Sequence, residues 1–226
     1  MAKIAMLHTS FVFLNVDTQI QDLIGSLLPE DELIHFVDSD VLASVVRDGG
    51  ISPSSEERML HLAQAAERAG ADVIFSACSS LGPAMDAAKA HVGIPIVKVD
   101  DAMTRDAAMA GGTVGVLATV PTTLAPTADL IRLHARDAGR EIQVFEQLAA
   151  GAFDVLMNGD REAHDEMVRQ SALELVDRGV DQIVLAQASM ARLAGPLGEL
   201  TGIPVLASPK VGVENLAELV RSGLEA

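Results

Sequence analysis

Short apolar runs alternate with longer amphipathic stretches along most of the chain. Apolar runs of four to six residues between helical stretches indicate strands buried on both faces, and such strands form parallel sheets. The predicted strands are Ile4–Leu7, Leu33–Asp38, Val73–Ala77, Val114–Leu117, Ile142–Glu146 and Ile183–Ala186. Helices are predicted between them, including one that starts near Ser54 or Ser55 and ends at Gly70, and one over Glu162–Arg178. The pattern therefore predicts an α/β fold.

The same series of elements occurs twice, and each half closes with a short strand at a Gly-Ile-Pro sequence. Five pairs of equivalent residues are 109 positions apart, namely Phe36 and Phe145, Glu57 and Glu166, Gly70 and Gly179, Asp72 and Asp181, and Pro95 and Pro204. At the start of the chain Thr9 aligns with Thr119, 110 positions later. One continuous doubly wound sheet would also give similar halves, but a spacing held at five landmarks favours duplication. We expect two α/β units related by a pseudo-twofold axis.

Charge and composition exclude several classes of partner. The chain has 16 Lys and Arg against 32 Asp and Glu, a net charge of −16, and no basic cluster offsets it. We therefore expect no nucleic-acid partner and no membrane partner, because their phosphates would be repelled. Aromatic residues make up 3% of the chain, with no Trp or Tyr, which argues against base-stacking platforms. A small anionic substrate is still compatible with this charge, because a site can be locally positive.

Two further features concern the compartment and the class of site. Cys78 is the single cysteine, so the chain cannot form an internal disulfide or a zinc site built from several cysteines. There is no uninterrupted apolar run of about 18 residues, so no transmembrane helix is predicted. We expect a cytoplasmic protein that holds no metal.

Small polar residues follow the predicted strands. Ligands of open α/β sheets bind beyond the carboxyl ends of the strands, where backbone N–H groups of the following helices also point. The candidate residues in these positions are His8, Thr9 and Ser10, Cys78, Ser79 and Ser80, Thr119, Thr122 and Thr123, and Gln187, Ala188 and Ser189. Such a set suits a carboxylate held by neutral hydrogen bonds. Cys78 is the one strong nucleophile in it, and a helix N-terminus favours its thiolate.

Ordinary structural roles compete with these assignments. A lone cysteine is often a small core residue, and Thr9, Ser10 and Thr122 could simply cap helices. His8 is a candidate acid or base, or a hydrogen-bonded core histidine. The acids around His164 lie at the start of a predicted exposed helix, where they complement the helix dipole, so we do not assign them to a metal.

Three segments stand out: "SACSSLG" after a strand, "VGVLATVPTT" at the start of the second half, and "IVLAQASM" at the mirror position. Together they resemble segments of the aspartate/glutamate/hydantoin racemase superfamily. The resemblance extends over essentially the whole chain. It implies cofactor-independent chemistry at a carbon next to a carboxylate or carbonyl, which in the family's racemases is carried out by two cysteines on opposite faces of the substrate.

Carried onto this sequence, the first family cysteine is Cys78 and the second position is occupied by Gln187. Glutamine has no titratable group near neutrality, which argues against ordinary two-cysteine racemisation. The resemblance implies that Cys78 and Gln187 are the catalytic positions. It also implies that the substrate is bound by small residues near them, namely Thr9, Ser10, Ser79, Ser80, Thr119, Thr122, Ala188 and Ser189.

We therefore predict an α/β fold of two pseudo-symmetric flavodoxin-like lobes with parallel sheets and an active site in the cleft between the lobes. The first lobe is predicted to comprise residues 1–98 and 207–226, because the family architecture implies that the C-terminal helix near Val213–Arg221 returns to it. Residues 99–206 form the second lobe. The resemblance also implies a homo-oligomer.

The predicted activity is that of a cofactor-independent, cysteine-dependent isomerase or racemase acting on a small carboxylate or carbonyl compound. A decarboxylase that protonates one face is an alternative, since one-sided chemistry needs a single acid. A non-catalytic small-molecule-binding relative is a second alternative.

Overall fold

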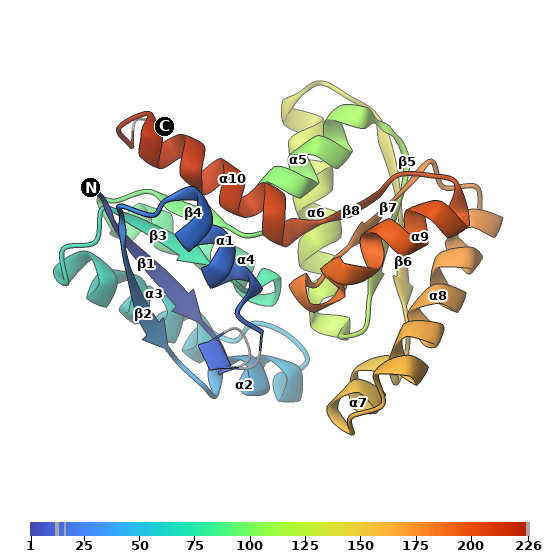
Figure 1. The fold of residues 1–226 in the computed structure, drawn as a ribbon, viewed down its shortest axis with the longest axis horizontal. Coiled ribbons are helices and arrows are strands. Elements are labelled where there is room, and N and C mark those ends of the chain that lie inside the picture. Colours follow the sequence, from blue (N-terminus) through green and yellow to red (C-terminus); the bar gives the residue numbers. More distant parts are fainter. Residues whose placement is uncertain (12–13, 16, 225–226) are drawn as a thin grey trace. The chain divides into compact units, whose positions relative to one another are not determined.

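The computed structural model describes residues 1–11, 14–15 and 17–224, and the chain divides into two compact units (Figure 1). Unit 1 comprises Met1–Val99 and Pro209–Ala226, and unit 2 comprises Asp100–Ser208. Within the described ranges each unit contains one four-stranded parallel sheet with flanking helices, which confirms the predicted fold class.

The sheet of unit 1 has the strand order β2-β1-β3-β4. Its strands are β1 (Lys3–His8), β2 (Glu32–Val37), β3 (Val73–Ser76) and β4 (Ile96–Lys98). Its helical segments are α1 (Gln19–Leu27), α2 (Val41–Asp48), α3 (Pro53–Arg68), η2 (Ser79–Leu81), α4 (Gly82–Ala88), η3 (Lys89–His91) and α10 (Ser208–Arg221). The central strand β1 pairs with β2 and β3, so that Leu7 lies beside Phe36 on one side and Ser76 on the other.

Unit 2 repeats this topology with the strand order β6-β5-β7-β8. Its strands are β5 (Gly112–Ala118), β6 (Ile142–Leu148), β7 (Gln182–Leu185) and β8 (Val205–Ala207). Its helical segments are α5 (Asp101–Ala110), α6 (Pro121–Asp137), α7 (Ala152–Met157), α8 (Arg161–Asp177), η4 (Ala188–Leu193) and α9 (Ala194–Thr201). The equivalent orders fit the 109-residue spacing, because each strand and each α-helix of one unit has a counterpart in the other, although the short helix η3 has none.

Successive side chains of the central strands point to opposite faces of each sheet, and helices cover both faces. In unit 1 the fully buried Ala5 and Leu7 pack with residues of α2, α3 and α4, and the neighbouring Ile4 and Met6, also fully buried, point to the other face. In unit 2 Leu117 packs with residues of α8 and α9 in the same way. Strands covered on both faces have no polar face, which is why they appear in the sequence as continuous apolar runs.

Helix α3 begins slightly earlier than the sequence predicts. Its N-cap is Ser52, Pro53 is the first helical residue, and Ser55 lies inside the helix. The Ser52 N–H donates to Ser55 Oγ at 2.8 Å and the Ser55 N–H donates to Ser52 Oγ at 3.3 Å. The prediction of a start at Ser54 or Ser55 was therefore wrong, because the serine pair forms a reciprocal capping box around the proline.

The C-terminal helix α10 belongs to unit 1. The Arg221 Nη2 donates to the Leu27 carbonyl at the end of α1, 2.8 Å away. A Cβ on Gly212 would lie 2.3 Å from the Val99 carbonyl oxygen, so only glycine permits this approach of α10 to the segment after β4.

Candidate active site

Cys78 lies between the end of β3 and the start of the short helix η2. The last ladder bond on this side is donated by the Ala77 N–H to the Leu7 carbonyl at 3.3 Å. Cys78 follows in an extended conformation, with φ −129° and ψ 110°, and caps the short helix η2 that leads into α4. Its side chain is half-buried, packs beside the apolar core of unit 1 and is not in a disulfide. Cys78 thus lies at the carboxyl edge of the sheet, at the residue from which a helical turn starts.

The other predicted residues of unit 1 lie at the same edge. Thr9 is 5% exposed and follows β1, the strand next to β3. Ser79 and Ser80 are buried in η2, directly after Cys78. Ser10 is half-buried. The structure therefore brings the predicted hydroxyl groups of unit 1 to the edge that carries the thiol.

His8 is the last residue of β1 and is buried, with a hydrogen bond of 2.9 Å between its Nε2 and Nδ1 of His35 on β2. Burial, and secondarily the neighbouring His35, lowers the pKa of His8 to about 4, so the imidazole is neutral near pH 7. Alternation along β1 directs the His8 side chain to the face of Met6, away from the face of Leu7 and Thr9. The sequence did not predict His35 as its partner. A proton-transfer role for His8 stays a prediction.

A buried lysine lies on the strand next to Cys78. Lys98, on β4, is 3% exposed and pairs in the sheet with Ser76, two residues before Cys78. Its Nζ is 2.7 Å from Oδ2 of Asp86 on α4. Lys98 was not among the predicted site residues, although a lysine within an apolar strand is a usable signal, because a buried charge needs a partner.

Gln187 occupies the equivalent place in unit 2. It follows β7 in an extended conformation with φ −134° and ψ 134°, and it caps the short helix η4 that leads into α9. The Ala186 N–H donates to the Leu117 carbonyl at 2.9 Å, as the Ala77 N–H donates to Leu7 in unit 1. The two candidate catalytic positions are therefore the same position of a repeated structure, each at the edge of its own sheet.

The side-chain oxygen of Gln187 accepts three hydrogen bonds. They come from the Thr119 N–H at 2.6 Å, the Thr119 hydroxyl at 3.1 Å and the Val120 N–H at 3.2 Å. Val120 is the N-cap of α6, so these donors lie at the start of a 17-residue helix. Peptide N–H groups can only donate, which fixes Oε1 as the end of the amide that faces them. The sequence predicted Thr119 and Gln187 at the same sheet edge, but it gave no sign of Val120 or of these hydrogen bonds.

The remaining predicted residues of unit 2 lie in the two helices that start at this edge, α6 and η4. Thr122 lies half-buried in the first turn of α6, Ala188 is 7% exposed, and Ser189 is half-buried in η4. The Thr123 hydroxyl donates to the Val120 carbonyl at 2.8 Å, which is a local capping bond.

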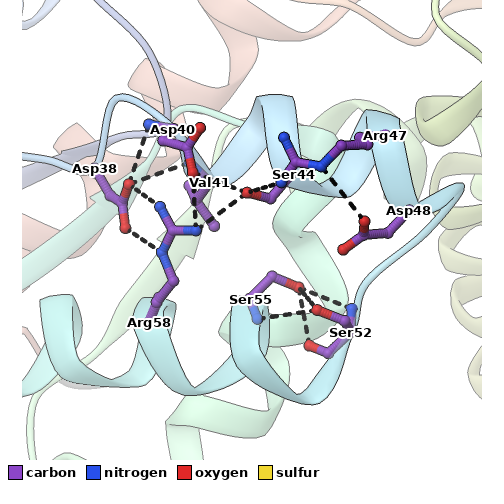
Figure 2. A network of polar contacts seen from close by, with 9 residues as sticks. All are labelled: Asp38, Asp40, Val41, Ser44, Arg47, Asp48, Ser52, Ser55 and Arg58. Atoms are coloured by element: carbon purple, nitrogen blue, oxygen red, sulfur yellow. Dashed lines mark hydrogen bonds and ion pairs between the residues drawn. The ribbon is translucent and has the colours of Figure 1, made fainter.

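An ion-pair network follows β2 in unit 1 (Figure 2). The Asp38 carboxylate accepts bonds from Nε and Nη2 of Arg58 and from the N–H groups of Asp40 and Val41 at the start of α2. Arg58, on α3, also contacts the Asp40 carboxylate and the Ser44 hydroxyl, as Figure 2 shows. The Arg58 guanidinium holds the pKa of Asp38 below its usual range. This network ties α2 and α3 to the end of β2.

A second ion pair anchors η4 in unit 2. Arg192 of η4 contacts both carboxylate oxygens of Asp165 on α8, and Nδ1 of the fully buried His164 is 2.7 Å from Asp165 Oδ1. The start of this helix was predicted to be exposed, and for His164, which is fully buried, that prediction was wrong. In the described part of the chain, no three His, Cys, Asp or Glu side chains are grouped so that they could hold a metal ion.

The comparison with protein families decides the assignment of the chain. The model of the Asp/Glu/hydantoin racemase family matches residues 15–216. The chain belongs to this racemase family. No curated protein matches its sequence.

Solved structures of Asp/Glu/hydantoin racemases share the fold. A glutamate racemase from Bacillus anthracis superposes with a TM-score of 0.74 at 18% identity, over 100% of this chain and 84% of that chain. A glutamate racemase from Francisella tularensis, solved with D-glutamate, gives 0.76 at 15% identity, over 100% and 83%. An allantoin racemase from Klebsiella pneumoniae gives 0.65 at 18% identity, over 99% and 89%. Among the described residues, no helix combines the length and the apolar character that crossing a bilayer requires.

Proposed function

We propose that this racemase-family chain is a cofactor-independent isomerase that acts, through Cys78, at the carbon next to a carboxylate or carbonyl group of a small molecule. The observation that carries the proposal is the position of Cys78. The only thiol of the chain lies half-buried at the carboxyl edge of a parallel sheet, between a strand and a helical turn. Ligands of α/β sheets bind at this edge, and N–H groups at a helix start favour a thiolate.

In the proposed reaction the Cys78 thiolate takes a proton from the substrate carbon, and the C–H electron pair moves into the adjacent carbonyl to form an enolate. For the configuration to invert, a water molecule protonates the opposite face of the enolate, and the Cys78 thiol gives its proton to the hydroxide that is left, which restores the thiolate. Hydroxyl and N–H groups at the same edge, from Thr9, Ser10, Ser79 and Ser80, bind the substrate and stabilise the developing oxyanion.

Unit 2 supplies binding groups in this proposal. Gln187 orients the substrate, because its amide neither takes nor gives a proton. Thr119, Thr122, Ala188 and Ser189 are proposed to bind the substrate as well. With one titratable catalytic group, proton transfer by the protein is expected on one face of the carbon.

The test is hydrogen exchange in deuterated buffer, with a panel of small chiral carboxylates and hydantoins followed by NMR and chiral chromatography. The native chain is expected to exchange the α-hydrogen of at least one compound. Cys78→Ala and Cys78→Ser should lower that rate roughly 10²–10⁴-fold, the range of a positioned acid or base. Ser222→Ala, on an exposed C-terminal residue, is the matched control and should leave the rate unchanged.

Full exchange by Cys78→Ala would contradict the proposal. Release of carbon dioxide with deuterium at one stereocentre would indicate the decarboxylase instead. Ligand-induced stabilisation with no turnover, insensitive to Cys78→Ser, would indicate a binding protein.

A further inference from the structure

Each unit contains a surface groove between two helices that pack on the same face of its sheet. In unit 1 the groove lies between α3 and the α4–η3 segment and has a volume of about 320 Å³, and in unit 2 it lies between α8 and the η4–α9 segment and has about 600 Å³. We call them the α3–α4 groove and the α8–α9 groove. All eight residues that line the α3–α4 groove have their counterpart, 109 positions later, in the lining of the α8–α9 groove. Each groove can therefore serve as a reference for the other.

The α3–α4 groove combines an apolar floor with an acidic rim. Ala84 and Ala88 of α4 are buried, and Leu60 of α3 is half-buried beside them. Glu56 and Glu57, both exposed on α3, line the same groove. An apolar groove between helices is one of the recurring sites at which proteins bind an amphipathic helix.

In unit 2 the two equivalent acids are bound by arginines of the chain itself. Glu166, at the place of Glu57, accepts hydrogen bonds from Nε and Nη2 of Arg169 at 2.6 and 2.5 Å, and this guanidinium lowers the pKa of Glu166 to about 2. Asp165, at the place of Glu56, is contacted by both Nη atoms of Arg192. Unit 2 thus shows that guanidinium groups fit the acids at this rim.

Unit 1 has the acids without the arginines. Leu60 takes the place of Arg169, and Pro83 takes the place of Arg192. Within the described part of the chain, neither carboxylate of Glu56 and Glu57 has a hydrogen-bond or ion-pair partner, and Arg58 of the same helix is bound to Asp38 and Asp40. Carboxylates beside an apolar floor suit an arginine side chain, because its methylene groups lie along apolar surface while its guanidinium binds a carboxylate through two N–H groups.

We propose that the α3–α4 groove is a docking site for an amphipathic helix of a partner protein, whose arginine lies beside Glu57 as Arg169 lies beside Glu166 in unit 2. The apolar residues of that helix pack on Ala84 and Ala88. The net charge of −16 favours a basic partner over a second copy of this chain, because two acidic surfaces repel each other. The inference goes beyond the proposed function and does not depend on it.

The test is a titration of the folded chain, labelled with ¹³C at its alanine and leucine methyl groups, with a capped helical peptide that presents arginine and leucine on one face and alanine on the other. The peptide is expected to shift the Ala84 and Ala88 resonances until they saturate. The same peptide with glutamate in place of arginine should shift neither resonance.

Matched variants locate the contact. Glu57→Gln should weaken the binding of the arginine peptide roughly fivefold, the upper end for an exposed ion pair. Leu60→Arg gives unit 1 the residue that unit 2 has at this place, so it should neutralise Glu57 within the chain and weaken the binding roughly tenfold. Glu166→Gln, at the equivalent acid of unit 2, is the control and should leave the binding at Ala84 and Ala88 unchanged.

Four outcomes would overturn the inference. The arginine peptide could fail to shift Ala84 and Ala88, could shift only Leu193 and Leu197 of the α8–α9 groove, or could bind folded Glu57→Gln as tightly as the native chain. Equal affinity for acetyl-arginine amide alone would indicate a site for a small guanidinium compound instead of a protein helix. If Leu60→Arg does not fold, Glu57→Gln, at an exposed position, carries the test. The readout needs no turnover, so Cys78→Ala should bind the peptide as the native chain does, whatever becomes of the catalytic proposal.

Discussion

Replacing Gln187 by leucine should destabilise unit 2, because the change keeps a side chain of similar size and removes the oxygen that accepts three hydrogen bonds from Thr119 and Val120. Thr119 and Val120 are 4% and 8% exposed, so their two N–H groups would be left buried without a partner. A buried unsatisfied donor costs about 1–3 kcal/mol, whereas the Thr119 hydroxyl can rotate to another acceptor. We expect a loss of about 3 kcal/mol from the free energy of unfolding.

The loss can be measured by urea unfolding and by thermal melting. A change of 1 kcal/mol lowers the Tm of a domain of 150–250 residues by roughly 2–4 °C, so about 3 kcal/mol corresponds to roughly 6–12 °C. Amide exchange of Thr119 and Val120 should accelerate in parallel. Gln187→Glu keeps an oxygen that faces the Thr119 and Val120 donors and should lose far less, and Gln143→Leu, on the exposed face of β6, should change little.

A loss below about 0.5 kcal/mol in Gln187→Leu, with unchanged exchange of the two amides, would refute the reasoning. It would mean that the three contacts of Oε1 contribute nothing and that Gln187 does not hold the start of α6.

Three further outcomes follow from the polar contacts and the packing. Asp38→Asn removes the charge that Arg58 faces and should lower the free energy of unfolding by about 2 kcal/mol at pH 7, as measured by urea unfolding. Because the pKa of Asp38 is depressed in the folded chain, the stability that its carboxylate contributes is present above the unfolded pKa and is lost as pH falls through the folded pKa. The difference in stability between the native chain and Asp38→Asn should therefore shrink in acid. The pKa of His8 is lowered from 6.5 to about 4, so between these pH values the unfolded chain binds a proton at His8 and the folded chain does not. The free energy of unfolding should therefore fall as pH drops from 6.5 to 4. His8→Asn, which also loses the hydrogen bond to His35, should make that pH dependence flatter. Gly212→Ala would place a methyl group 2.3 Å from a backbone oxygen and should loosen α10, seen as faster amide exchange in that helix, whereas unchanged exchange would show that the close approach is not required.

The alternation of apolar runs and helices predicted the fold well, because strands buried on both faces have a distinctive apolar pattern. The repeat was recognisable since duplication keeps the spacing of landmarks such as Asp72 and Asp181. Exact helix starts were harder to predict. The start of α3 at Pro53 depends on a capping box between two serines, and the sequence offers several serines at that place.

The candidate site was predicted in its residue types but not in its contacts. Strand ends identified Cys78 and Gln187, because ligand-binding residues of parallel sheets lie there. The bond from Thr119 to Gln187 spans 68 residues, and the Arg58 pair with Asp38 spans 20, so no local pattern reveals them. His35 was missed for the same reason, since its role depends on the register of β1 against β2.

The central claim, that Cys78 is the reacting group, is tested most directly by the alkylation rate of this thiol. The chain has a single cysteine, so intact mass after iodoacetamide treatment reports Cys78 alone. At pH 7 the folded chain is expected to react at least about tenfold faster than the urea-unfolded chain, because peptide N–H groups at the start of a helical turn favour the thiolate. A folded chain that reacts at the same rate as the unfolded chain, or more slowly, would indicate a structural cysteine and would contradict the account.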